Sequence, residues 1–151
     1  MSLNPATVGI LAIVLGLSSC TAAPWVTSEV PAPVEYEEQE IGTICDTVVR
    51  MIRAYYPPAS TILNLQIDPA SRVILSQRLP LHLARVGFGL AGEGSLNSKA
   101  LPAYVEVSSI EEGVFLKVAM RERTVSTWLP KPMQGQLSSS GTWTLTEAKN
   151  D

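Results

Sequence analysis

Few side chains in this sequence have the types and spacing that catalysis requires. The one histidine, His82, lies between two leucines in a predicted helix and fits helix packing better than proton transfer. Glu111 and Glu112 are adjacent in a predicted turn, where both carboxylates face solvent instead of converging in a cleft. The run 121–123, Arg-Glu-Arg, is typical of a strand face or a bend. We therefore expect no catalytic residue and predict that the protein is not an enzyme.

The sequence also offers no cluster of metal ligands, so no metal site is predicted. Cys45 has no companion Cys or His at ligand spacing, and it lies on the apolar stripe of a predicted helix. We expect its thiol to be a small buried hydrophobic group. No disulfide framework is expected, because the only other cysteine, Cys20, has a different predicted role.

The segment 87–92, Gly-Phe-Gly-Leu-Ala-Gly, matches the G-x-G-x-x-G pattern of dinucleotide sites. In those sites the glycines follow a strand and open a helix, so that the helix N-terminus meets the pyrophosphate. Here the run follows a predicted helix and precedes a strand or loop, which is the reverse order. We expect Gly87 to end that helix, and we predict no cofactor.

The first twenty residues contain the most specific signal in the chain. An apolar run of ten residues, 8–17, is half of the roughly 20 that a membrane-spanning helix needs, and it fits the core of a cleaved signal peptide. The segment 17–20, Leu-Ser-Ser-Cys, resembles the lipobox of bacterial lipoproteins. This resemblance implies that residues 1–19 are removed and that the Cys20 thiol carries a lipid such as palmitate. An uncleaved N-terminal anchor and an ordinary secretion signal are the alternatives.

A linker is predicted at residues 20–40, after the lipidated cysteine. It contains three prolines and five glutamates but no Lys or Arg, a composition that buries too little apolar surface to fold alone. Trp25 is expected at the lipid headgroups, and the alternative is that it is exposed in the linker or docked on a partner. Position 21 is Thr and not Asp, which by the lipoprotein resemblance favours the outer membrane. Residues 41–151 are then a single periplasmic domain.

The charge of the chain argues against nucleic acid as a direct partner. The formal net charge is −3, from 11 Lys and Arg against 14 Asp and Glu. The acidic residues are concentrated in the linker, so the domain itself is only weakly basic. Nucleic-acid binding calls for Lys and Arg clustered on one face, and the sequence shows no such cluster.

Hydrophobic periodicity predicts an α+β domain. Residues 41–55 repeat apolar side chains, Val48 among them, at helical spacing, and Pro57 follows. Asp68 precedes a second helix that carries Val73, Ile74, Leu81 and Ala84 and that breaks or restarts at Pro80. The predicted strands are 61–67, 88–91, 101–110, 114–120, 124–129 and 141–146, with 111–113 as a hairpin turn. We expect a small sheet of about four or five strands with two helices packed on one face.

This order of elements resembles the TrbH family of conjugal transfer lipoproteins. The likeness includes Cys20, the first helix, the strand Thr-Ile-Leu-Asn-Leu-Gln at 61–66, the run Arg-Val-Gly-Phe-Gly at 85–89, and the hairpin 101–118. The resemblance implies an outer-membrane lipoprotein that faces the periplasm within a type IV secretion system, the mating-pair apparatus of conjugation. Small secretion lipoproteins of the DotD type are similar.

We therefore expect a structural subunit of a conjugative secretion channel, with the other channel subunits as partners. The lipid anchor supplies membrane attachment, and a homo-oligomer or ring within the complex is one arrangement. Trp128 and Trp143 are the candidate partner contacts, through the free sheet edge and the C-terminal strand. For Trp143 the alternative is that it closes the core of its own domain. A free-standing periplasmic ligand-binding lipoprotein is the alternative function, and it would need a deep apolar pocket.

Overall fold

The structure is a computed structural model that describes residues 35–92, 98–110, 112–132, 135–139 and 141–147. The predicted signal peptide, Cys20, Trp25 and Glu111 lie outside the described residues. The helices are α1 (Glu38–Arg53), the 3-10 turn η1 (Pro58–Ser60), α2 (Pro69–Leu75) and α3 (Leu79–Arg85). The strands are β1 (Ile62–Ile67), β2 (Gly89–Leu90), β3 (Leu101–Ile110), β4 (Gly113–Met120), β5 (Arg123–Pro130) and β6 (Thr144–Glu147).

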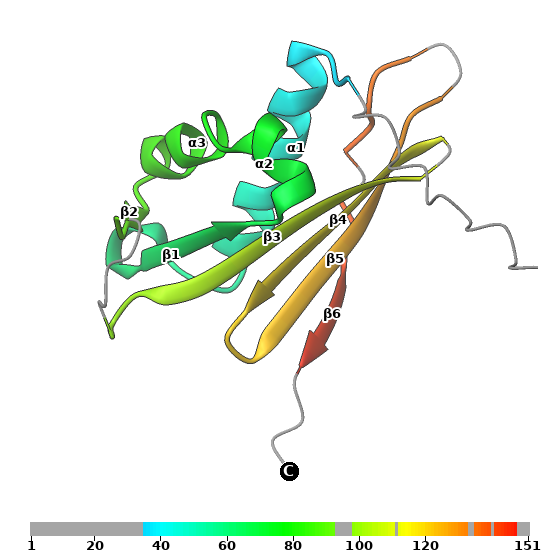
Figure 1. Cartoon of the computed structure of the whole chain (residues 1–151). Coiled ribbons are helices and arrows are strands. Elements are labelled where there is room, and N and C mark those ends of the chain that lie inside the picture. Colours follow the sequence, from blue (N-terminus) through cyan, green and yellow to red (C-terminus); the bar gives the residue numbers. More distant parts are fainter. Residues whose placement is uncertain (1–34, 93–97, 111, 133–134, 140, 148–151) are drawn as a thin grey trace, which may run out of the picture. The chain divides into compact units, whose positions relative to one another are not determined.

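The domain is α+β, as predicted, but its sheet is larger than expected. Six strands pair in the order β2-β1-β3-β4-β5-β6, and three α-helices pack against the sheet where two were predicted. β1 is parallel to both of its neighbours, whereas β3 to β6 form an antiparallel meander. The helices lie together on one side of the sheet (Figure 1). The chain between the parallel strands β1 and β2 forms the crossover that such a pair needs, and α2 and α3 lie in it.

Helix α1 begins three residues earlier than its apolar pattern indicates. Glu37 is the N-cap, and a capping box links it to Glu40, whose Oε2 accepts a hydrogen bond from the Glu37 amide at 3.2 Å. Such boxes satisfy two amides that the first helical turn leaves without partners. The acidic end of the predicted linker is therefore the start of the domain. Val48 and Cys45 are fully buried on the sheet side of the helix, as predicted.

The carboxylate of Glu40 is buried and paired across the fold. The side chain is only 2% exposed, and its Oε1 lies 2.6 Å from Nζ of Lys131, which follows β5. The carboxylate raises the pKa of Lys131, mainly through their hydrogen bond. Charged groups are rarely buried without such a partner. This contact fixes the chain after β5 against the N-terminus of α1.

The second predicted helix is two short helices, and its exposed face differs from the prediction. Pro80 occupies the second position of α3, where its missing N–H costs nothing, which confirms the predicted restart. The stripe 71, 75, 79, 83 faces the sheet, and Ser71 there exchanges two hydrogen bonds with the Val107 backbone. Val73 and Leu81, which are among the apolar residues that the sequence assigns to this helix, are exposed. Apolar residues occur on both faces of this segment, so periodicity could not choose its buried face.

The sheet strands alternate between a buried and an open face. On the helix side, alternate residues of β3, β4 and β5 are buried; those of β4 are Val114, Leu116, Val118 and Met120, as the sequence predicted. The residues between them point to the opposite side and are mostly half-exposed. No helix in the described part of the chain packs on that opposite side (Figure 1).

Candidate functional site: a partner-binding surface

One end of the open sheet face is apolar. The antiparallel register places Phe115 opposite Trp128, and Ile110 and Pro130 lie on either side of Gly113 in the next row. Trp128 is 37% exposed and Ile110 is 48% exposed. Aromatic side chains presented on an uncovered surface are typical of protein interfaces.

Gly113 provides the space that the Trp128 ring occupies. A Cβ on Gly113 would lie 2.5 Å from Cζ2 of Trp128 and 2.4 Å from the carbonyl oxygen of Leu129, distances that real structures do not tolerate. From the sequence this glycine was assigned to the hairpin turn, but it is the first residue of β4. Its role is to let the indole lie across the neighbouring strand.

We expect Gly113→Ala to destabilise the domain by about 1–3 kcal/mol and to displace the Trp128 ring, because part of the clash is with rigid backbone. Denaturant unfolding and tryptophan fluorescence measure the two effects. Gly42→Ala is the matched control, since a Cβ there meets nothing within 4 Å and the site is helical. The control should be neutral or stabilising by up to about 1 kcal/mol. Equal stability of the two variants would contradict the placement of Trp128.

Trp143 packs against its own domain. It is partly buried against the core, and its Nε1 donates a hydrogen bond to the Tyr55 hydroxyl at 3.2 Å. The Tyr55 ring also carries the guanidinium of Arg123, 5.5 Å from its centroid. These contacts join the end of α1 to β5 and to the chain before β6. Of the two roles considered for Trp143, the structure favours closing the core of this domain.

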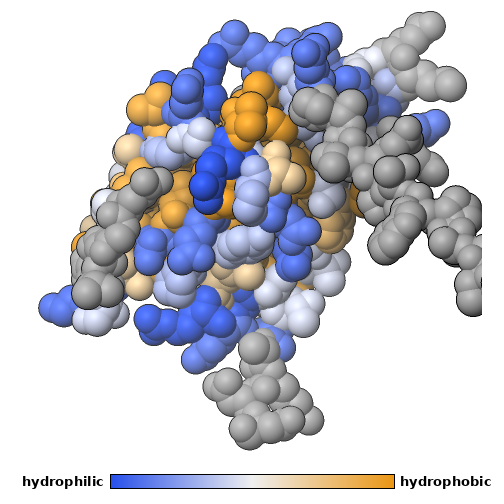
Figure 2. Space-filling view, viewed as in Figure 1, coloured by the Kyte–Doolittle hydropathy of each residue, from blue (hydrophilic) through white to orange (hydrophobic). Residues whose placement is uncertain are grey.

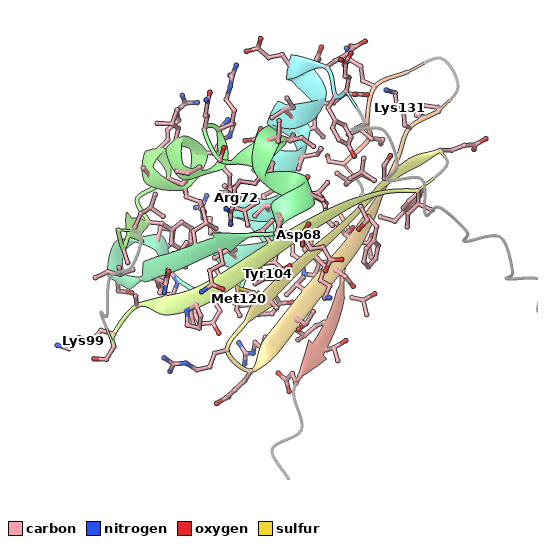
Figure 3. All side chains as sticks on the ribbon, viewed as in Figure 1. Asp68, Arg72, Lys99, Tyr104, Met120 and Lys131 are labelled. Atoms are coloured by element: carbon pink, nitrogen blue, oxygen red, sulfur yellow. The ribbon has the colours of Figure 1, made fainter. Side chains whose placement is uncertain are left out.

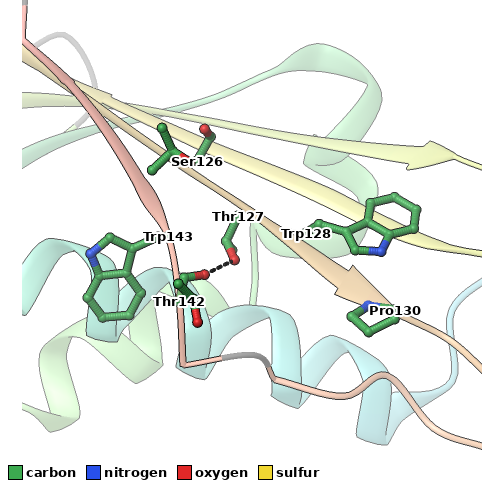
Figure 4. A pocket seen from close by; sticks show the side chains of 7 residues that line it. Ser126, Thr127, Trp128, Pro130, Thr142 and Trp143 are labelled. Carbon is green, nitrogen blue, oxygen red and sulfur yellow. Dashed lines mark hydrogen bonds between the residues drawn. The ribbon is translucent and has the colours of Figure 1, made fainter.

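The two tryptophans nevertheless line one hollow. Figure 4 shows Trp128 and Trp143 on either side of the hydrogen bond that Thr127 Oγ1 donates to the Thr142 carbonyl, at 2.7 Å. The hollow has a volume of about 270 Å³. We call it the tryptophan hollow; its lining residues are Ser126, Thr127, Trp128, Pro130, Thr142, Trp143 and Thr144. Both tryptophans are candidate partner contacts from the sequence, but their proximity follows only from the fold.

A sheet edge lies beside the tryptophan hollow. β6 pairs antiparallel with the first half of β5, from Arg123 to Ser126, so the predicted C-terminal strand belongs to this domain's own sheet. All four residues of β6 are exposed, and the strand is the last in the sheet order. An exposed edge strand offers backbone donors and acceptors to a strand from another chain.

The rest of the open face is polar. Lys117 Nζ lies 3.0 Å from Glu106 Oε2, and the Tyr104 hydroxyl donates to Asp68 Oδ1 at 2.8 Å. This hydrogen bond raises the pKa of Tyr104. Figure 3 shows Tyr104 and Asp68 near the end of β1. These polar groups pair with one another, and they precede the apolar end along β3.

The other candidate residues have structural positions. His82 Nδ1 lies 2.8 Å from Asp46 Oδ1 and joins α3 to α1, and Cys45 is fully buried. Gly87 has φ +98° just after α3, which confirms the helix-end assignment and the reversed order of the glycine motif. Glu112 is exposed beside the β3–β4 turn. Among the described residues, no group of three or more His, Cys, Asp or Glu could hold a metal ion.

Two further observations concern membrane-spanning helices and similarity to known proteins. Of the helices in the described ranges, none has the length and apolarity needed to cross a membrane. Comparison with protein-family models, with curated proteins and with solved structures found no match to this chain.

Proposed function

We propose that this protein is a lipid-anchored structural subunit of a conjugative type IV secretion channel, held at the outer membrane and facing the periplasm. Acylated Cys20 anchors it, the chain before α1 provides reach, and the domain contacts another channel subunit. The lipobox-like segment supports attachment to the membrane. The resemblance of the element order to transfer lipoproteins supports a place in a conjugative secretion system. The geometry of the domain supports the apolar end of the open sheet face as the surface of this contact.

The apolar end of the sheet, which no helix among the described residues covers, supports this proposal. Exposed Trp128 lines the tryptophan hollow together with Thr144, the first residue of the edge strand β6, and exposed Ile110 lies two strands away from Trp128 on β3. Tryptophan is enriched among the residues whose truncation costs an interface 2 kcal/mol or more. Backbone pairing at the edge can fix the direction of a partner strand while the hollow accepts its side chain. A structural subunit needs only such a contact surface, without a catalytic group.

The same geometry disfavours the ligand-binding alternative. Small-molecule sites are usually enclosed and measure about 300–1,000 Å³. The tryptophan hollow is about 270 Å³ and lies at the surface. A second hollow of about 410 Å³ is lined by charged and polar groups of α1, including Asp46, Arg50 and Arg53. Neither hollow is the deep apolar pocket that a free-standing binding lipoprotein would need.

Truncation of Trp128 tests the proposed surface. We expect Trp128→Ala to weaken co-purification with the channel by about 30-fold, the equivalent of about 2 kcal/mol, while the protein stays folded and in the membrane fraction. Trp128→Phe keeps an aromatic anchor and should retain most of the binding. Ile62→Ala is the control, because Ile62 is 40% exposed but lies on β1, far along the sheet order. If a folded Trp128→Ala variant still assembles fully, the tryptophan hollow is not part of the interface.

A further inference from the structure

A second surface, formed by α2 and α3, has no role in the contact proposed above. Val73 is 89% exposed and Leu81 is 61% exposed. Val73 lies on α2 and Leu81 on α3, and both are on the side away from the buried stripe 71, 75, 79, 83. Figure 2 shows apolar side chains at the surface over α2 and α3, surrounded by hydrophilic groups. The surface over α2 and α3 therefore presents two aliphatic side chains to its surroundings.

The segment that forms this face carries only basic charge of its own, although Glu38 and Asp46 of α1 pair with its Arg78 and His82. From Pro69 to Gly92 the sequence contains three arginines and no Asp or Glu. Arg78 is paired with Glu38 of α1. Within the described residues, no carboxylate is paired with Arg72 or Arg85, which flank the two exposed aliphatic side chains. The nearest acid in sequence, Asp68, already accepts hydrogen bonds from Tyr104 and from the Ala70 amide.

We propose that the α2–α3 face rests on a bilayer surface that contains anionic phospholipid. An interfacial segment combines a basic, polar border with aliphatic side chains that enter the boundary between headgroups and acyl chains. Arg72 and Arg85 complement phosphate groups, and Val73 and Leu81 enter the boundary. The short helices suit this role, because the sheet behind them already fixes their orientation. The domain thereby takes one orientation on the membrane, with β6 at the sheet edge remote from α2 and α3.

An environment-sensitive dye at position 73 tests this proposal in the full-length protein. Val73→Cys can be labelled selectively, because Cys45 is fully buried and burial raises its pKa to about 12. The labelled protein is reconstituted into vesicles with phosphatidylglycerol, or into vesicles of phosphatidylcholine alone. Thr146→Cys on β6, labelled in the same way, is the control position. Unmutated protein is treated with the same dye as a control. Labelling of this protein would mean that the Cys20 thiol is not acylated, so a missing lipid anchor is detected separately from the docking of the α2–α3 face.

We expect a blue shift and quenching by brominated lipid at position 73 only, in the vesicles with phosphatidylglycerol, and loss of both signals at high salt. Arg72→Gln with Arg85→Gln should reduce the docked population by about tenfold or more, since each basic residue near an anionic surface contributes about fivefold. Equal signals in the two kinds of vesicle, or at positions 73 and 146, would overturn the proposal. If the blue shift at position 73 requires the channel subunits but no lipid, this face binds a protein partner, and the membrane proposal is overturned as well.

Discussion

Val48→Asp is expected to unfold the domain. Val48 is fully buried in the middle of α1, on the face that packs against the sheet. An aspartate there would place a carboxylate among aliphatic side chains such as Ile44 and Ile52, without a cation in the buried cluster to pair with it. The cost should exceed about 4 kcal/mol, close to the whole stability of many domains of this size. Circular dichroism and a denaturation curve on the purified variant measure the loss.

The matched control is Val73→Asp, which makes the same chemical change at a side chain that is 89% exposed. The free energy of unfolding of that variant should lie within about 0.5 kcal/mol of the value for the unmutated protein, because an exposed carboxylate keeps its hydration. A folded Val48→Asp protein, or equal losses in the two variants, would show that α1 does not pack on the sheet as described.

Cys20→Ala is expected to release the protein from the membrane almost completely. Each buried methylene of an acyl chain contributes about 0.8 kcal/mol, so two or three chains give an anchor that does not dissociate on an experimental timescale. Neither a lone Trp25 nor the α2–α3 face can replace that affinity. Metabolic labelling with palmitate, followed by fractionation of the envelope, measures acylation and location in one experiment. An unlabelled native protein, or a variant that still pellets with membranes, would refute the lipid anchor.

Much of the fold could be predicted because its signals are local. The apolar period of α1 and the alternation in β3 and β4 are set by adjacent residues, and the structure confirms both. The restart at Pro80 follows from one missing amide. The start of α1 was missed because its capping box lies in an acidic segment that composition assigned to the linker. The sheet is larger than expected because all six predicted strand segments join it, including the two-residue β2, which pairs with β1.

The candidate surface was only half predictable. Trp128 and Trp143 could be selected from the sequence as large side chains on strands, but their positions depend on contacts between distant segments. Trp143 is fixed by Tyr55, 88 residues earlier in the chain. Trp128 needs the missing Cβ of Gly113, and a glycine after a turn gives no sign of the ring it will accommodate. Pairing across such distances leaves no periodic trace in the sequence.

If this domain is a lipid-anchored part of a secretion channel, it should purify from transfer-competent cells together with the other subunits. A tagged native protein, extracted with mild detergent from the outer-membrane fraction, is predicted to bring down the channel subunits in a fixed ratio, and deletion of its gene should strongly reduce DNA transfer. Trp128→Ala should lose the subunits while remaining folded and acylated. Recovery of the native protein alone, with DNA transfer unchanged by the deletion, would contradict the account.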